Sequence, residues 1–195
     1  RRRPLPSGRL RPADALGFGS ALTLGGLGLL VWLCGPLAGA VAFVTWVSYV
    51  FLYTPLKPVT SLATIVGAVP GALPPVIGWA AARGSLDLGA GLLFAILFLW
   101  QIPHFLAIAW MYREDYARGG FPMLPVLDQQ GGMTARQSFP NAVALLLVSL
   151  MPTPAGLAGP WYFFGALVLG LAFAAMAWRL LRRRSVAAAR ELFLA

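Results

Sequence analysis

Charged residues are scarce in this sequence, and their scarcity argues against a soluble protein. Only 11% of the 195 residues are charged, hydrophobic residues make up 59%, and the mean hydropathy is +0.76. A soluble domain has about 25% charged residues. The apolar runs also lack the alternation that a transmembrane β-barrel requires. We therefore expect an all-α, polytopic membrane helix bundle.

Cysteine and acidic residues are also few. The one cysteine, Cys34, has no second thiol for an internal disulfide, and we interpret it as a small buried hydrophobic residue. Six acidic residues against 15 basic ones give a net charge of +9 and a pI near 11.1. The arginines punctuate apolar runs, so we interpret them as topology determinants and predict no nucleic-acid partner.

An initiator methionine and a signal segment are both missing from the start of the sequence, which begins Arg1-Arg2-Arg3-Pro4. A new apolar segment opens near Leu192 and stops at Ala195. We expect residues 1–195 to form a single, partial membrane domain from a longer chain, and we expect this fragment alone to be inactive.

Long uncharged windows predict the number of spans. Charge is absent from 15–56, 58–82, 88–112 and 137–178. A spanning helix needs about 20 apolar residues, so the first and last windows hold two spans each. Gly35-Pro36 and the stretch 152–160 supply the breaks. The six predicted spans lie near 15–33, 37–53, 60–82, 88–111, 137–151 and 161–181.

The distribution of basic residues predicts the orientation. With six spans, every lysine and arginine except Arg83 falls on one side of the membrane. The positive-inside rule places that side, with loop 112–136 and both ends, in the cytoplasm. We predict a multi-pass protein of a bacterial inner membrane, in contact with membrane lipid.

Glycines and prolines interrupt the third span. Pro70, Pro74 and Pro75 remove helical hydrogen bonds, which predicts a kink or an unwound turn beside a cavity. Gly67 and Gly71 fit close helix packing through small residues equally well. Both interpretations stay open from the sequence.

Chemistry-bearing residues concentrate between Trp100 and Asp128. This stretch holds the only histidine, His104, and three of the six acidic residues. Ionisable groups at membrane depth are costly and indicate function by default. Two structural alternatives remain: a core histidine bonded to a neighbouring helix, and a solvated helix end in which Arg118 pairs with Glu114 or Asp115.

Several motifs resemble those of one enzyme family. They are R-P-L-P-S-G at Arg3–Gly8, Y-x-x-x-K at Tyr53–Lys57, G-A-L-P-P-x-I-G-W at Gly71–Trp79, and the words P-H-F and F-P-M-L-P-V within Trp100–Val126. In this order they resemble the protohaem IX farnesyltransferases (haem O synthases), a branch of the UbiA-type intramembrane prenyltransferases.

The resemblance implies both fold and reaction. The family fold has nine helices around a cavity open to the cytoplasm, of which this chain would hold the third to the eighth. The implied enzyme transfers a farnesyl group from farnesyl diphosphate to a vinyl group of haem B, giving haem O for haem A biosynthesis. Mg²⁺ would be the cofactor, and association with haem A synthase or terminal-oxidase assembly is implied as well.

The resemblance also implies roles for individual residues. Tyr53, Lys57 and Asp115 would act in catalysis, and Asp115 would also be a Mg²⁺ ligand, since Mg²⁺ prefers carboxylates and substrate phosphates. Taken alone, Tyr53 and Lys57 also suit an interfacial tyrosine and a snorkelling lysine. The implied substrate-binding residues are Arg3, His104, Arg113, Tyr116 and Arg118, of which His104 could contact a tetrapyrrole. Candidates to stabilise an allylic cation are Trp46, Tyr49, Trp79, Trp100 and Phe105.

Some departures and rival functions remain. Where many UbiA-type enzymes have Asp-x-x-x-Asp, this sequence has Asp115 and Gly119, which favours the haem-directed branch over quinone-directed enzymes. Ile102 and Leu106 replace a proline and a tryptophan of the family's histidine motif. The alternatives are a UbiA-type enzyme acting on a quinone precursor or a chlorin, and a non-enzymatic membrane transport or assembly component.

Overall fold

The computed structural model describes residues 4–195, and in this part of the chain every regular element is helical. The elements are α1 (Pro12–Cys34), α2 (Pro36–Val47), the π-helix η1 (Ser48–Tyr53), α3 (Thr54–Leu56), α4 (Ala63–Ala72), α5 (Pro74–Arg83), α6 (Leu88–Met111), α7 (Arg113–Arg118), α8 (Leu124–Leu127), α9 (Gly132–Leu150), α10 (Pro160–Arg183) and α11 (Val186–Leu194). The all-α fold class is confirmed.

Five helices of the described residues are long and apolar enough to cross a membrane. They are Pro12–Cys34, Pro36–Leu56, Ala63–Arg83, Leu88–Met111 and Pro160–Arg183. The remaining predicted span corresponds to α9, whose 19 residues extend about 28 Å at 1.5 Å per residue. Its first turns carry Arg136, Gln137 and Asn141, which lowers its hydropathy.

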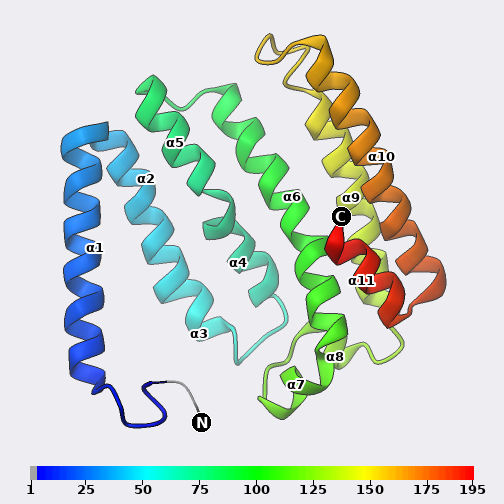
Figure 1. Cartoon of the computed structure of the whole chain (residues 1–195), viewed down its shortest axis with the longest axis horizontal. Helices are drawn as coiled ribbons and strands as arrows, with labels where there is room; N and C mark the ends of the chain where they lie inside the picture. The colour runs from blue at the N-terminus through cyan, green and yellow to red at the C-terminus, as the bar shows by residue number, and fades with distance from the viewer. Residues whose placement is uncertain (1–3) are drawn as a thin grey trace.

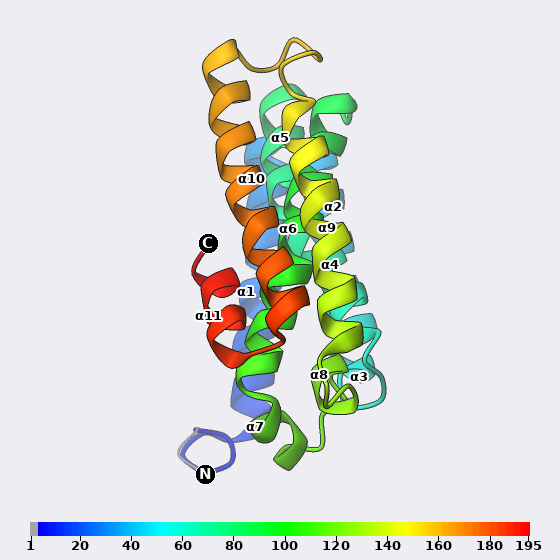
Figure 2. The same ribbon diagram turned by 90° about the vertical axis from the view of Figure 1, so that its right-hand side faces the viewer.

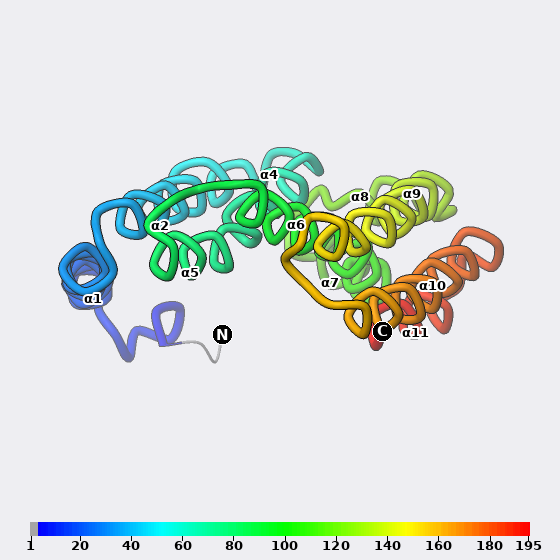
Figure 3. Tube along the Cα trace, turned by 90° about the horizontal axis from the view of Figure 1, so that it is seen from above, coloured from blue at the N-terminus to red at the C-terminus, as the bar shows by residue number. Residues whose placement is uncertain are grey.

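The long helices stand side by side in a curved row that runs from α1 to α10, with α6 near the middle (Figures 1 and 3). The short helices α7 and α8 lie beyond the C-terminal end of α6, at one end of the long helices, which we call the α7–α8 end (Figure 1). Figure 2 shows α11 folding back beside α6 and α10, on both of which it packs.

The two halves of the row are packed differently. A core of buried residues joins α6, α9, α10 and α11, and includes Trp110, Leu145, Phe173, Leu180 and Leu192. By contrast, α1 has no buried residue, and apolar side chains such as that of Trp32, 80% exposed, cover its surface. An exposed apolar surface of this size is costly in water and is typical of a helix that faces lipid or another apolar helix.

A π-helical turn leads into the predicted Y-x-x-x-K motif. The N–H of Thr54 bonds the carbonyl of Tyr49 five residues back, and its hydroxyl donates to the same oxygen at 2.9 Å. Pro55 has no N–H to donate to the carbonyl four residues before it. The wider turn ends the regular α2 helix and rotates the residues that follow it; such turns frequently mark functional sites.

The third predicted span is broken, as the prolines predict. α4 ends at Ala72 and α5 begins at Pro74. The glycines are closely packed too: a Cβ on Gly67 would lie 2.6 Å from Cδ2 of Tyr53, and one on Gly71 would overlap Oε1 of Gln101. The kink and the close packing, left as alternatives by the sequence, therefore both occur.

The loop predicted at 112–136 is shorter than expected, because α9 begins at Gly132 and not near 137. The carboxylate of Asp128 accepts hydrogen bonds from the Gly132 N–H at 3.1 Å and from the Thr134 N–H and hydroxyl at 2.8 and 3.0 Å. These bonds satisfy backbone donors at the start of the helix. The predicted start of this helix followed Arg136, the last charged residue before an apolar run, and so did not include the turn that Asp128 caps.

Replacing Asp128 with alanine is expected to destabilise the start of α9 by about 0.5–2 kcal/mol, the usual cost of losing such a cap. Hydrogen exchange should accelerate at the amides of residues 132–135. Asp14→Ala is the matched control, because the ion pair that Asp14 forms within residues 4–195 is with Arg11 on the surface, where ion pairs contribute about 0–1 kcal/mol. Equal exchange in both variants would contradict the capping role.

Candidate functional site

A cavity of about 590 Å³ opens among α2, η1, α4, α6 and the α7–α8 end. This volume is within the range of about 300–1,000 Å³ found for small-molecule sites. Its lining residues are Ala42, Thr45, Trp46, Tyr49, Tyr53, Lys57, Thr64, Gly67, Pro70, Gly71, Ile77, Gln101, Phe105, Ile108, Ala109, Tyr116 and Met123. The lining is mainly apolar and aromatic, and its charged residue, Lys57, lies toward the α7–α8 end.

We call the part of the cavity at the α7–α8 end its mouth. Tyr53 and Lys57 come together there, which their sequence spacing alone did not establish. The ammonium of Lys57 lies 5.9 Å from the centroid of the Tyr53 ring and 5.2 Å from that of Phe121. Within residues 4–195, Lys57 forms no ion pair with a carboxylate. The mouth therefore presents a half-buried positive charge beside a phenol, which suits an anionic ligand.

Tyr116 completes the mouth from α7. It lines the cavity, and its ring lies edge-on to Phe121 with the centroids 6.4 Å apart. Met123 closes the same side, where its sulfur accepts a weak hydrogen bond from the Thr64 hydroxyl at 3.9 Å. Sequence reasoning missed Phe121, although it stands within the F-P-M-L-P-V word that carried the resemblance.

Three of the five aromatic candidates line the cavity and two do not. Trp46, Tyr49 and Phe105 face it. Trp79 packs in a separate cluster with Val41 and Val76, under the guanidinium of Arg83. Trp100 stacks on His104. The rotation of each helix about its own axis decides which rings reach the cavity, and the pattern of apolar residues did not reveal that rotation.

Gln101 is a polar residue that sequence reasoning missed. It lies within the apolar helix α6, is only 5% exposed, and borders the cavity beside Gly71. Its Nε2 donates to the Leu97 carbonyl at 3.0 Å. A buried amide in an apolar span is costly unless it is hydrogen-bonded. A glutamine within an uncharged window therefore could have been recognised from the sequence as a candidate site residue.

Asp115 and Arg118 form an ion pair on the outer side of α7. This is one of the two helix-end pairs that the sequence allowed. Both side chains are mostly exposed, at 61% and 77%, and neither lines the cavity. Arg113 is directed elsewhere, with its guanidinium 4.7 Å from the centroid of the Trp110 ring.

His104 does not line the cavity. Its ring stacks between those of Trp100 and Phe193, with centroids 4.7 and 4.9 Å away, and is therefore directed toward α11. This aromatic packing is neither the hydrogen-bonded histidine of the structural alternative nor a tetrapyrrole contact, so the role of His104 stays a prediction. The remaining predicted substrate-binding residue, Arg3, lies outside the described residues.

The acidic side chains provide little for a metal ion. Asp14, Asp115 and Glu191 pair with arginines, and Asp87 and Asp128 accept hydrogen bonds at helix starts. In residues 4–195, no three histidine, cysteine or acidic side chains gather where they could hold a metal. The predicted ligand Asp115 has one acidic neighbour on α7, Glu114, and two carboxylates do not make a complete metal site.

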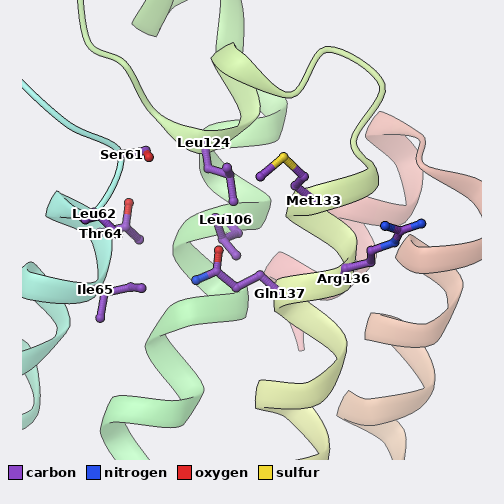
Figure 4. A pocket seen from close by; sticks show the side chains of 9 residues that line it. All are labelled: Ser61, Leu62, Thr64, Ile65, Leu106, Leu124, Met133, Arg136 and Gln137. Atoms are coloured by element: carbon purple, nitrogen blue, oxygen red, sulfur yellow. The ribbon is translucent and has the colours of Figure 1, made fainter.

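A second pocket of about 470 Å³ lies between α4 and α9, over Leu106 of α6 (Figure 4). The Gln137 amide points into it, whereas the Arg136 guanidinium turns away (Figure 4). Thr64 borders both pockets. Because no charged group points into this pocket, it is a weaker candidate for an anionic ligand than the cavity at Lys57.

Known proteins match this chain along its whole length. Proteins named protoheme IX farnesyltransferase are 51% identical over 189 residues in Solibacter usitatus (strain Ellin6076) and 47% identical over 196 residues in Anaeromyxobacter sp. (strain Fw109-5). These alignments cover 96% and 100% of this chain, but 64% and 66% of the relatives. The chain thus spans about two thirds of the length of the curated relatives that it matches.

The fold has a solved counterpart as well. A structure described under the biosynthesis of digeranylgeranylglyceryl phosphate synthase in membranes superposes with a TM-score of 0.83 at 19% identity, covering 99% of this chain and 67% of that one. At this identity the likeness shows the fold alone. The UbiA prenyltransferase family matches residues 1–195. The chain is therefore a multi-pass membrane protein that belongs to the UbiA prenyltransferase family.

Proposed function

We propose that the protein containing this chain transfers a farnesyl group from farnesyl diphosphate to a vinyl group of haem B, giving haem O in haem A biosynthesis. The observation that carries this proposal is the identity of 51% to a protein named protoheme IX farnesyltransferase, over 96% of this chain. The cavity supports it, since a charged mouth and an apolar, aromatic interior suit a prenyl diphosphate.

The proposed reaction has three steps. The C1–O bond of farnesyl diphosphate breaks, and diphosphate leaves with the electron pair. The vinyl π electrons then form a carbon–carbon bond to C1. Water adds to the resulting cation and loses a proton. Lys57 would stabilise the departing charge, and Tyr53 could donate a hydrogen bond to it. The rings of Trp46, Tyr49 and Phe105 would stabilise the allylic cation.

UbiA prenyltransferases generally use a divalent metal with their diphosphate substrates. We propose Mg²⁺ as that ion and Asp115 as one ligand among others, since the described residues do not make a complete metal site by themselves. Tyr116, which lines the cavity, remains a proposed substrate contact. Arg118 does not line it and is retained because it pairs with Asp115, the proposed metal ligand. Arg113 and His104 are left out because their side chains are directed away from the cavity. Arg3 remains a prediction from the sequence.

We also propose a bacterial inner membrane as the location, with the α7–α8 end in the cytoplasm. The basic residues support this orientation. Lys57 follows α3, and Arg113 and Arg118 begin and end α7, both helices at that end, whereas Arg83 ends α5 at the other end (Figure 1). Association with haem A synthase or terminal-oxidase assembly belongs to the same proposal, as does a single membrane domain over 1–195.

The test uses the full-length protein in membrane vesicles with haem B, farnesyl diphosphate and Mg²⁺. Chromatography with mass spectrometry should detect haem O, and Asp115→Asn should reduce it if this carboxylate contributes to the metal site. A prenylated phenolic acceptor with unchanged haem B would instead support a quinone-directed enzyme. Absence of any prenylated product from folded protein would support the membrane-component alternative.

A paired substitution at His104 separates packing from haem contact. His104→Phe keeps a ring between Trp100 and Phe193, so haem B affinity is expected to change less than about threefold, well under 1.4 kcal/mol. His104→Ala should lower thermal stability, because it leaves a cavity in this stack. Loss of haem binding in both variants, measured by spectroscopic titration, would show that the imidazole itself contacts haem.

A further inference from the structure

Lining residues recur along one helix of the cavity, one on almost every turn. From the mouth inward, along α2, η1 and α3, they are Lys57, Tyr53, Tyr49, Trp46 with its neighbour Thr45, and Ala42. Eleven positions separate Tyr53 from Ala42. At 1.5 Å per residue they would span about 16 Å, and the wider π-helical turn at Ser48–Tyr53 shortens this slightly, to just under three helical turns. An extended isoprene unit is about as long as one such turn, ~5 Å.

The inner end of the cavity is closed by small and tightly packed residues. Ala42 is 9% exposed, and its neighbour Val41 packs against Val76 and Ala90. Ile77 borders the cavity and contacts this same cluster. Beyond Ala42, therefore, the row of lining residues meets packed core, and a side chain larger than alanine would occupy the last turn of the cavity.

We infer that Ala42 and Ile77 set the length of the prenyl chain that the cavity accepts, matching it to three isoprene units. This inference rests on the proposed function, in which the diphosphate lies at Lys57 and the chain extends inward. The terminal unit lies at Ala42 and Ile77, two units beyond the unit at Tyr49. Neither residue touches the reacting atoms, so both determine specificity and not chemistry.

The test compares geranyl, farnesyl and geranylgeranyl diphosphate as donors to haem B, with full-length protein in membrane vesicles. Ala42→Leu and Ala42→Phe should raise the ratio of geranyl to farnesyl transfer by about tenfold or more, the discrimination that a few carbon atoms give in an apolar pocket. Ile77→Ala should shift preference the other way, toward geranylgeranyl. Because Ile77→Ala removes side-chain volume, its opposite shift can be measured even if the larger side chains at position 42 prevent folding.

Val44→Phe is the matched control. Val44 lies two positions further along α2, is 54% exposed and does not line the cavity, so its added ring leaves the donor ratios unchanged. Transfer that persists with unchanged ratios in the Ala42 and Ile77 variants overturns the length inference alone. If the unmodified protein transfers none of the three donors, the proposed function itself fails.

Discussion

Replacing Lys57 with methionine is expected to lower the rate of prenyl transfer by about 10²–10³-fold, the usual cost of removing one group that stabilises developing charge. Methionine keeps the apolar stem, so the contacts with Tyr53 and Phe121 are partly retained while the charge is lost. Single-turnover assays with farnesyl diphosphate and haem B measure the effect directly.

Arg113→Met is the control for this experiment. Arg113 also lies near the α7–α8 end and its motif made it a candidate substrate contact, but its guanidinium rests on Trp110, away from the cavity. We expect less than about a fivefold change in rate, because screened surface charges contribute about 1 kcal/mol or less. Equal losses of transfer rate in both variants would contradict the binding of the diphosphate in the cavity beside Lys57.

Among these substitutions, Gly131→Ala is expected to lower the stability of the folded protein most. Gly131 has a φ of 70°, and a Cβ there would lie 2.7 Å from Cζ3 of Trp110, a side chain only 3% exposed. Left-handed backbone costs a non-glycine residue about 1–2 kcal/mol, and overpacking adds about 1–3 kcal/mol. The apparent Tm should fall by about 2–4 °C for each kcal/mol.

Gly120→Ala isolates the contribution of the backbone. Gly120 has a φ of 72°, and a Cβ at this position would have no other atom within 4 Å, so the substitution carries the conformational cost without the collision. Thermal unfolding of the purified full-length protein, followed by tryptophan fluorescence, should show a clearly smaller loss for Gly120→Ala. Similar losses would mean that the Trp110 side chain relaxes without cost.

Much of the fold was predictable because a membrane imposes simple rules on the sequence. Helix α6, Leu88–Met111, begins with its uncharged window 88–112 and ends one residue before the window does. The interruption between α4 and α5 follows from Pro70, Pro74 and Pro75. The start of α9 was placed too late, because the hydrogen bonds of the Asp128 cap are formed between residues that no hydropathy pattern connects.

The candidate site was only partly predictable. Among the site residues that the motifs predicted within 4–195, Tyr53, Lys57 and Tyr116 line the cavity. Asp115, Arg113, Arg118 and His104 do not. Gln101 and Phe121 were missed because hydropathy and motif spacing do not show which face of a helix a side chain occupies. A rotation of 100° per residue separates a cavity contact from a core contact.

The sequence by itself determined the membrane environment, the all-helical class and the family, since each depends on local composition or on ordered motifs. The tertiary structure decided which side chains meet. The π-turn before Pro55 brings Tyr53 and Lys57 to the mouth, and the packing of α11 on α6 encloses His104 between rings. Such contacts join residues distant in the chain, and only the packing of whole helices brings them together.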